Sequence, residues 1–153
     1  MKKFKFSMQA VYDVKSAKER QIKGEYAALK KAENDLLDAK NRIRAGIEEQ
    51  RRKLEAKTAG GISVAEYQNC QDYIKSLYTN LKKIEDDIAS TRRAIEKKRA
   101  ELTDIYKDKK TLEKMCDEQR TAFMKEENAK EAKGIEDMLT AKMGSAGQTQ
   151  ESA

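Results

Sequence analysis

Apolar residues recur at alternating steps of three and four from Tyr67 to Phe123. This alternation places them along one side of an α-helix, and such a seam is where a second helix packs in a coiled coil. Four polar residues interrupt the seam: Thr91, Lys98, Lys109 and Gln119. The pattern predicts a long helix over about residues 64–140 that packs against another helix along its length.

The first part of the chain carries its own seam and predicts a helix over about residues 7–57, with Ser7 as a candidate N-cap. The apolar seam positions of this helix are Ile22, Tyr26, Leu29, Leu36, Ile43, Ile47 and Leu54. Two helices with matching seams are expected to cover each other.

Residues 58–62 separate the two seams and predict a turn. Gly60 and Gly61 favour the left-handed conformations that end a helix, and Ser63 with Glu66 forms the S-x-x-E capping box that begins one. A turn this short leaves room only for an antiparallel neighbour, so we expect the chain to fold back as a helical hairpin.

The predicted fold is all-α: residues 1–143 form a single domain, an antiparallel coiled-coil hairpin in which the second helix continues past the first as a single-helix extension. The small, polar residues 144–153 predict a disordered tail. With the turn centred near residue 60, the expected register is tightest beside the turn and looser toward the termini. It sets these residues opposite each other: Leu54 and Tyr67, Ile47 and Ile74, Ile22 and Lys98.

Composition agrees with a rod of paired helices. Charged residues make up 39% of the 153 positions, Pro is absent and Gly occurs only 7 times, which leaves apolar material for a stripe and too little for a globular core. No apolar run approaches the ~20 residues that a bilayer requires, and the basic start of the chain lacks the apolar block of a secretory signal. We therefore expect a cytoplasmic protein.

Catalytic chemistry is not indicated. The chain contains no His, no Cys-x-x-Cys and no Gly-rich phosphate loop, so we predict no catalytic, cofactor-binding or metal-binding residues and no enzyme. Cys70 and Cys116 both fall on the seam and are interpreted as small buried hydrophobes.

Charge and aromatic residues leave binding as the expected activity. The formal net charge is +6, and the surplus lies in residues 1–57, which fits either a solvated helix face or attraction to an acidic partner, nucleic acid or anionic lipid. Nucleic acid is the less favoured partner because acids are interleaved with the lysines and few aromatics lie among them. Tyr73 and Tyr78 flank the seam of the second helix, where they either shield it or form a docking patch.

Three segments resemble the flagellar export protein FliJ family. The segment Phe4-Lys-Phe-Ser-Met-Gln-Ala-Val-Tyr-Asp-Val-Lys15 resembles the start of that family. The segment Gly61-Ile-Ser-Val-Ala-Glu-Tyr-Gln-Asn-Cys-Gln-Asp-Tyr-Ile-Lys-Ser-Leu77 is similar to its turn and second-helix start, and Gly134-Ile-Glu-Asp-Met138 to its acidic C-terminal signature. The resemblance covers nearly the whole chain.

The resemblance implies a non-enzymatic, soluble component of the flagellar type III export apparatus, needed for flagellum biogenesis and motility. Such a protein couples the hexameric export ATPase to the membrane export gate and escorts export chaperones, and it lies at the cytoplasmic face of the cell membrane through its partners. The family's gate-binding residues match Tyr73 and Leu77, although Leu77 also lies on the seam. The end that faces the ATPase would comprise four apolar residues: Phe4, Phe6, Met8 and Val11.

Two alternatives have the same architecture. One is the equivalent stalk protein of a virulence type III secretion system, which differs in its partners. The other is a generic coiled-coil scaffold or a nucleic-acid-binding hairpin, which strong salt-dependent binding to DNA without binding to an export ATPase would favour.

Overall fold

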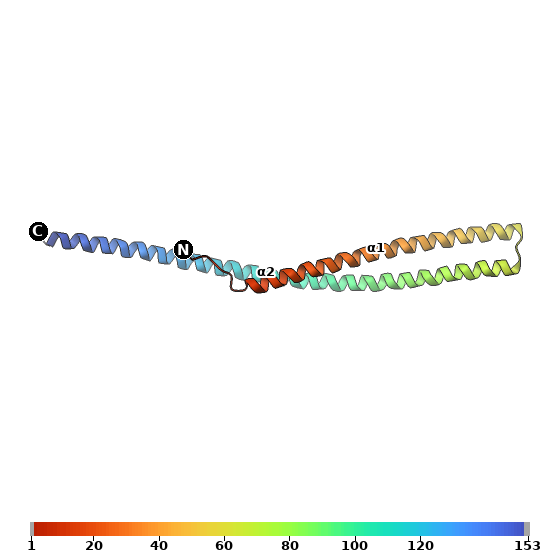
Figure 1. Ribbon diagram of the computed structural model, residues 1–153, viewed down its shortest axis with the longest axis horizontal. Coiled ribbons are helices and arrows are strands. Elements are labelled where there is room, and N and C mark those ends of the chain that lie inside the picture. Colours follow the sequence, from red (N-terminus) through yellow and green to blue (C-terminus); the bar gives the residue numbers. More distant parts are fainter. Residues whose placement is uncertain (1, 152–153) are drawn as a thin grey trace. The chain divides into compact units, whose positions relative to one another are not determined.

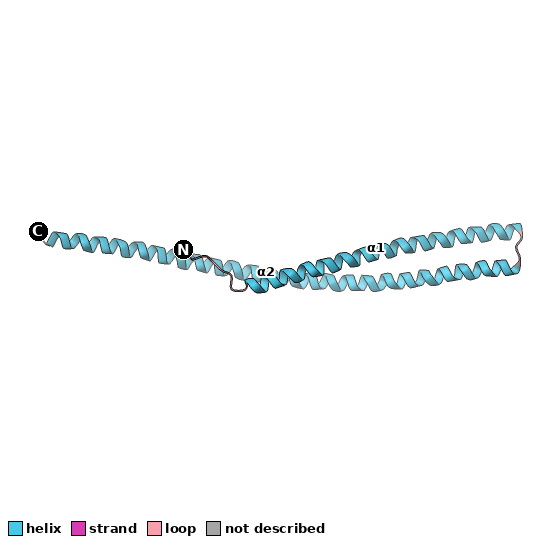
Figure 2. Ribbon diagram, viewed as in Figure 1, coloured by secondary structure: helices cyan, strands magenta, loops and turns pink. Residues whose placement is uncertain are grey.

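Two long α-helices make up the fold. The computed structural model describes the backbone of residues 2–151 and the side chains of residues 2–147. Helix α1 (Gln9–Gly60) and helix α2 (Val64–Glu151) are joined by a loop at residues 61–63 (Figures 1 and 2). No strand occurs in the part of the chain that is described, and the predicted all-α fold is confirmed. The loop lies later than the turn expected at residues 58–62, because α1 continues to Gly60.

The chain divides into two compact units, one at Lys18–Ile105 and one that combines Met1–Ala17 with Tyr106–Ala153. Each unit contains a segment that precedes the loop and a segment of α2. In each, contacts join residues far apart in sequence, as in the ion pairs Glu25 with Lys98 and Lys15 with Asp108. Packing between antiparallel segments therefore forms both units.

Helix α1 ends in a cap that requires glycine. Gly61 follows the last helical residue with a φ of 84°, in the left-handed region, and its N–H donates a 3.3 Å hydrogen bond to the carbonyl oxygen of Thr58. The Thr58 hydroxyl in turn donates to the carbonyl of Leu54 at 2.7 Å. The bond from Gly61 satisfies the carbonyl of Thr58, one of the last-turn groups that have no partner further along the helix.

Helix α2 begins at the cap predicted from the sequence. The Ser63 hydroxyl accepts a 3.2 Å hydrogen bond from the N–H of Glu66, and the Ser63 carbonyl accepts one at 3.0 Å from the N–H of Tyr67. Ser63 is therefore the N-cap of α2, as its spacing from Glu66 predicts.

Replacing Gly61 by Ala is expected to destabilise the protein by about 1 kcal/mol, because an L side chain is strained in the left-handed conformation. Gly60→Ala is the matched control: that residue is helical and nothing lies within 4 Å of an added Cβ. Urea unfolding followed by circular dichroism should show a lower free energy of unfolding for Gly61→Ala and an undiminished one for Gly60→Ala. Equal stability of the two variants would contradict the cap.

The core of the unit Lys18–Ile105 is a row of isoleucines at the predicted seams. The buried residues of this unit are Ile22, Ile47, Ile88, Ile95 and Ile105. Other seam residues, including Leu36 and Leu81, are only half-buried. A two-helix packing can cover one side of each helix, which is why full burial is confined to a few β-branched positions.

The register of this unit differs from the prediction. Ion pairs join α1 to α2 at three levels: Glu25 with Lys98 at 2.6 Å, Glu33 with Arg92 at 3.8 Å and Lys40 with Glu85 at 3.6 Å. These pairs fit a register that sets Ile47 level with Leu77, about three residues further along α2 than the expected partner Ile74. Because the seam repeats at steps of three and four, a shift by one seam position still matches apolar residues with apolar residues.

The prediction that the apolar pairing is tightest beside the turn is wrong. Tyr67, the seam residue nearest the loop, is exposed, and Leu54 and Ile74 are half-buried. The side chain buried most completely, Ile95, lies well away from the loop. In the observed register Tyr67 falls level with the exposed, charged Lys57 and not with an apolar residue of α1.

In the second unit, residues ahead of α1 lie along α2. The Phe4 and Phe123 rings have centroids 5.7 Å apart, the Tyr12 hydroxyl bonds Glu113 at 3.0 Å, and Leu112 is buried. This N-terminal segment, residues 2–8, is largely non-helical. It partners residues of α2 beyond Cys116, where the sequence predicts that the uncovered extension begins.

Helix α2 continues beyond these contacts. All residues of 128–147 are exposed, which agrees with a single-helix extension that begins later than expected. The backbone is helical through Glu151, where the sequence predicts a tail without regular structure; residues 152 and 153 lie outside the described part. A helix grows by one backbone hydrogen bond per residue and no Pro interrupts this one.

Candidate functional site

The two residues expected at the export gate lie on one side of α2. Tyr73 is 52% exposed and Leu77, four residues further on, is half-buried. The spacing stacks the two side chains on adjacent turns. Tyr73 therefore presents its ring to solvent, while Leu77 divides its surface between the seam and the exterior.

The four apolar residues expected at the ATPase-facing end are gathered in the unit that contains both chain ends. Phe4, Phe6 and Met8 are half-buried, and Val11 is 39% exposed on the first turn of α1. Arg120 lies 5.4 Å from the centroid of the Phe4 ring. Part of the surface of each phenylalanine is therefore buried within the protein, and the rest is accessible to solvent.

The sequence missed one residue of this apolar end. Val14 is more exposed than Val11 and follows it at helical spacing. The sequence contained a sign of this, because Val11 and Val14 are three residues apart and therefore lie on one side of the helix. Three exposed lysines precede them: Lys2, Lys3 and Lys5. The end is therefore both apolar and basic.

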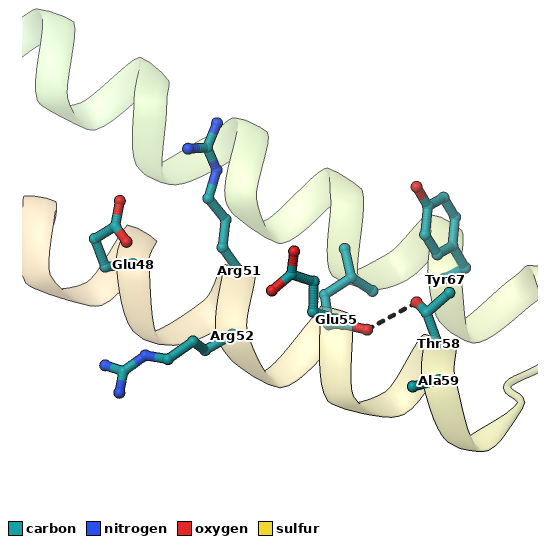
Figure 3. Close-up of a pocket in the computed structure, with 8 residues that line it drawn as sticks. Glu48, Arg51, Arg52, Glu55, Thr58, Ala59 and Tyr67 are labelled. Atoms are coloured by element: carbon teal, nitrogen blue, oxygen red, sulfur yellow. Dashed lines mark hydrogen bonds between the residues drawn. The ribbon is translucent and has the colours of Figure 1, made fainter.

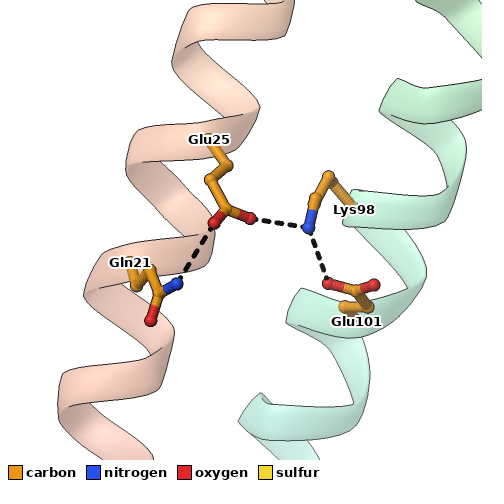
Figure 4. A network of polar contacts seen from close by, with 4 residues as sticks. All are labelled: Gln21, Glu25, Lys98 and Glu101. Atoms are coloured by element: carbon orange, nitrogen blue, oxygen red, sulfur yellow. Dashed lines mark hydrogen bonds and ion pairs between the residues drawn. The ribbon is translucent and has the colours of Figure 1, made fainter.

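Lys98, which interrupts the seam of α2, is paired by a polar network (Figure 4). Its ammonium lies 2.6 Å from a Glu25 carboxylate oxygen and 3.3 Å from Glu101, and Gln21 donates to Glu25 at 3.2 Å. The bond from Lys98, followed by that from Gln21, lowers the pKa of Glu25 below its ordinary 4.5. The bond to Glu25, followed by that to Glu101, raises the pKa of Lys98 above 10.5.

The signs of these shifts set the pH range over which the pair stabilises the protein. A lowered carboxyl pKa gives stability that is lost as the pH falls through the folded-state value, below 4.5. A raised ammonium pKa gives stability that is lost only above 10.5. The pair is intact at neutral pH, although its exposure to solvent keeps it weak.

Two further polar interruptions of the seam also have partners. The Lys109 ammonium lies 5.1 Å from the centroid of the Tyr12 ring, and the Gln119 side chain bonds the Ser7 hydroxyl at 3.0 Å. Ser7 is therefore engaged with α2 and is not the cap of α1, which begins at Gln9. The expected loosening toward the termini is wrong, because these polar residues make specific contacts and Leu112 among them is buried.

An open groove runs beside the loop, where α1 and α2 both contribute side chains. Figure 3 shows Arg51 extending from α1 toward α2, with Tyr67 on α2 and Thr58 facing it. The floor includes Leu54 and, further along, Ile74. We call this surface the turn-end groove, defined by Arg51, Leu54, Tyr67, Ile74, Lys75 and Tyr78.

Sequence reasoning missed Arg51 as part of this surface. Its guanidinium lies 5.8 Å from the centroid of the Tyr78 ring, and such a pair depends on the register of two helices. Tyr78 itself was expected to flank the seam, and it does so with 41% of its surface exposed.

Two features are absent from the described residues: a metal-binding cluster and a membrane-spanning stretch. Among them no three His, Cys, Asp or Glu side chains gather where a metal ion could bind. Neither helix, over the residues searched, has a stretch apolar enough to cross a bilayer. Cys70 and Cys116 are free and half-buried rather than buried.

Comparison with known proteins identifies the family. The family model described as flagellar FliJ protein matches residues 4–141. No curated protein and no solved structure matches the chain. The match spans most of the N-terminal segment, all of α1, the loop and most of α2. The chain therefore belongs to the FliJ family, whose members are non-catalytic components of the flagellar type III export apparatus.

Proposed function

We propose that this protein couples the hexameric export ATPase to the membrane export gate, and that it binds export chaperones in the same pathway. Membership of the FliJ family places it among export components. The observation that carries the finer proposal is that exposed apolar residues occur in both units, Tyr73 in one and Val11 in the other. A coupling protein needs two such surfaces, one for each partner.

Tyr73 is the proposed anchor of the gate surface. Exposed tyrosines supply a large contact area at low entropic cost and are frequent at the centres of interfaces. Leu77 would extend this contact by one helical turn with the part of its side chain that remains accessible. Binding to a membrane protein would also keep this chain at the cytoplasmic face of the membrane.

The apolar, basic end is the proposed ATPase surface. Val11 and Val14 are exposed there, and Phe4, Phe6 and Met8 hold the N-terminal segment against α2 with part of their surface. A partner that covers these exposed valines stabilises the complex by about 25 cal/mol for each Å² of apolar surface removed from water. The family match favours a flagellar ATPase over the homologue in a virulence system.

Val11→Glu is expected to weaken binding to the cell's own export ATPase about tenfold or more, because a carboxylate would have to be desolvated in the complex. Val64→Glu, which makes the same change at an exposed residue beside the loop, is the control and should bind as the unmodified chain does. A pull-down with purified ATPase, followed by titration of the bound fraction, provides the measurement. If the unmodified chain did not bind the ATPase at micromolar concentration, the proposal would be wrong. If both variants bound equally well, Val11 would not belong to the ATPase-binding surface.

A further inference from the structure

We infer that the turn-end groove binds an acidic amphipathic helix of a partner protein. This surface is separate from the proposed gate surface. Tyr78 lies five residues after Tyr73, which places the two rings roughly 140° apart around α2, and Tyr73 does not line the groove.

The groove has an apolar floor and aromatic walls. Leu54 from α1 and Ile74 from α2 are half-buried at its base. The rings of Tyr67 and Tyr78 stand beside them, each 41% exposed. An apolar base between two exposed tyrosines is a surface that a helix can cover with a stripe of leucines.

The groove continues along α2 for a length that suits a helix. A second depression shares Lys75 and Tyr78 with the first and reaches Lys82. From Val64 to Lys82 the rise along α2 is roughly 27 Å, or five helical turns. A third helix that lies along two packed helices places its side chains between theirs, whereas an extended peptide would find no strand edge to pair with.

Cations on the rim that make no ion pair favour an acidic partner. Arg51, Lys75 and Lys82 line the groove, and within the described residues none of the three has a carboxylate at ion-pair distance. Figure 3 shows the Arg51 guanidinium reaching across to α2 instead of toward Glu48 or Glu55. Three cations without anionic partners along one groove favour a ligand that carries carboxylates.

The acidic residues of the groove argue for a protein helix over a polyphosphate or a membrane. Four carboxylates also line it, Glu48 and Glu55 on α1 and Asp72 and Asp86 on α2, and they would repel a continuous row of phosphates. An amphipathic helix can place carboxylates at selected turns, beside the cations, and leave the other turns neutral. Its leucines would cover Leu54, Ile74 and the tyrosine rings.

The test measures binding of the full chain to a fluorescent synthetic peptide of about 18 residues that forms an amphipathic helix, with Leu on one face and Glu at the flanking positions. A second peptide carries Lys in place of each Glu. We expect the Glu peptide to bind at least tenfold more tightly than the Lys peptide, with an affinity that falls as salt is raised. Equal binding of the two peptides would overturn the inference.

Matched variants locate the binding. Lys75→Glu/Lys82→Glu should weaken binding of the Glu peptide at least fivefold, whereas Lys30→Glu/Lys31→Glu, an identical change of charge at exposed residues of α1, should not. Tyr78→Ala should weaken it similarly. Tyr106→Ala, which removes an exposed tyrosine paired with Lys110 in the other unit, should leave it unchanged.

Two outcomes would contradict this site. One is an equal loss for both lysine pairs, which would mean that net charge and not the groove drives binding. The other is binding to vesicles of phosphatidylcholine and phosphatidylglycerol that depends on Lys75 and Lys82 while the Glu peptide does not bind, which would assign the groove to anionic lipid. Neither outcome bears on the proposed gate and ATPase surfaces.

Discussion

Replacing Ile95 by Ala is expected to lower the free energy of unfolding by about 3 kcal/mol. Ile95 is 3% exposed, the lowest exposure among the buried residues. Truncating it removes apolar contacts and leaves a cavity in a seam that has few other fully buried side chains. Because a two-helix packing has no second layer to close that cavity, most of the loss should appear in the measured stability.

Ile135→Ala provides the control for this prediction. Ile135 is 56% exposed in the same helix, so its truncation removes little buried surface, and alanine favours the helix. Urea unfolding monitored at the helical circular dichroism band should separate the two variants clearly. Equal losses, or a loss below about 1 kcal/mol at Ile95, would mean that the seam is not the source of stability.

Replacing Tyr73 by Ala is expected to weaken binding to the membrane export-gate protein about tenfold or more and to leave the helices folded. With 52% of its surface exposed, the ring contributes little to packing between α1 and α2. Affinity for the purified gate protein and helical content by circular dichroism should be measured on the same preparation.

Tyr106→Ala is the matched control, because Tyr106 is similarly exposed on α2 and lies in the other unit. It should retain full gate binding. A loss of helical content in Tyr73→Ala would show that this ring belongs to the core, and unchanged binding would place the gate surface elsewhere. Leu77→Ala is a less useful variant, since a half-buried residue changes stability and binding together.

The sequence predicts the helices and the loop well because these are fixed locally. Gly61 and Ser63 act through their own backbone and near neighbours, and both caps were found at the predicted residues. The seams likewise follow from the helical repeat. The sequence does not reveal which seam residue of α1 lies opposite which seam residue of α2. A shift of three residues preserves the apolar match, and only contacts such as Glu25 with Lys98 distinguish the two registers.

The N-terminal segment shows a second limit of sequence reasoning. Residues 2–8 lie largely ahead of the predicted helix, so nothing in their pattern revealed that Phe4 contacts Phe123 or that Ser7 bonds Gln119. The polar seam residues alone indicate weak points, because their partners lie far away in sequence, 112 positions in the case of Gln119 and Ser7. The pairing of Arg51 with Tyr78, and hence the turn-end groove, depends on the register of the two helices, which the sequence does not reveal.

The contact of Ser7 with Gln119 also bears on how the chain folds during synthesis. The two residues are 112 positions apart, whereas the residues on either side of Gly61 are neighbours. Closing the long loop costs more entropy than closing the short one, so we expect pairing to begin at the loop and to proceed away from it. The N-terminal segment leaves the ribosome before α2 and cannot dock until α2 has been made as far as Phe123. Its phenylalanines would then be the last apolar residues of the chain to leave water.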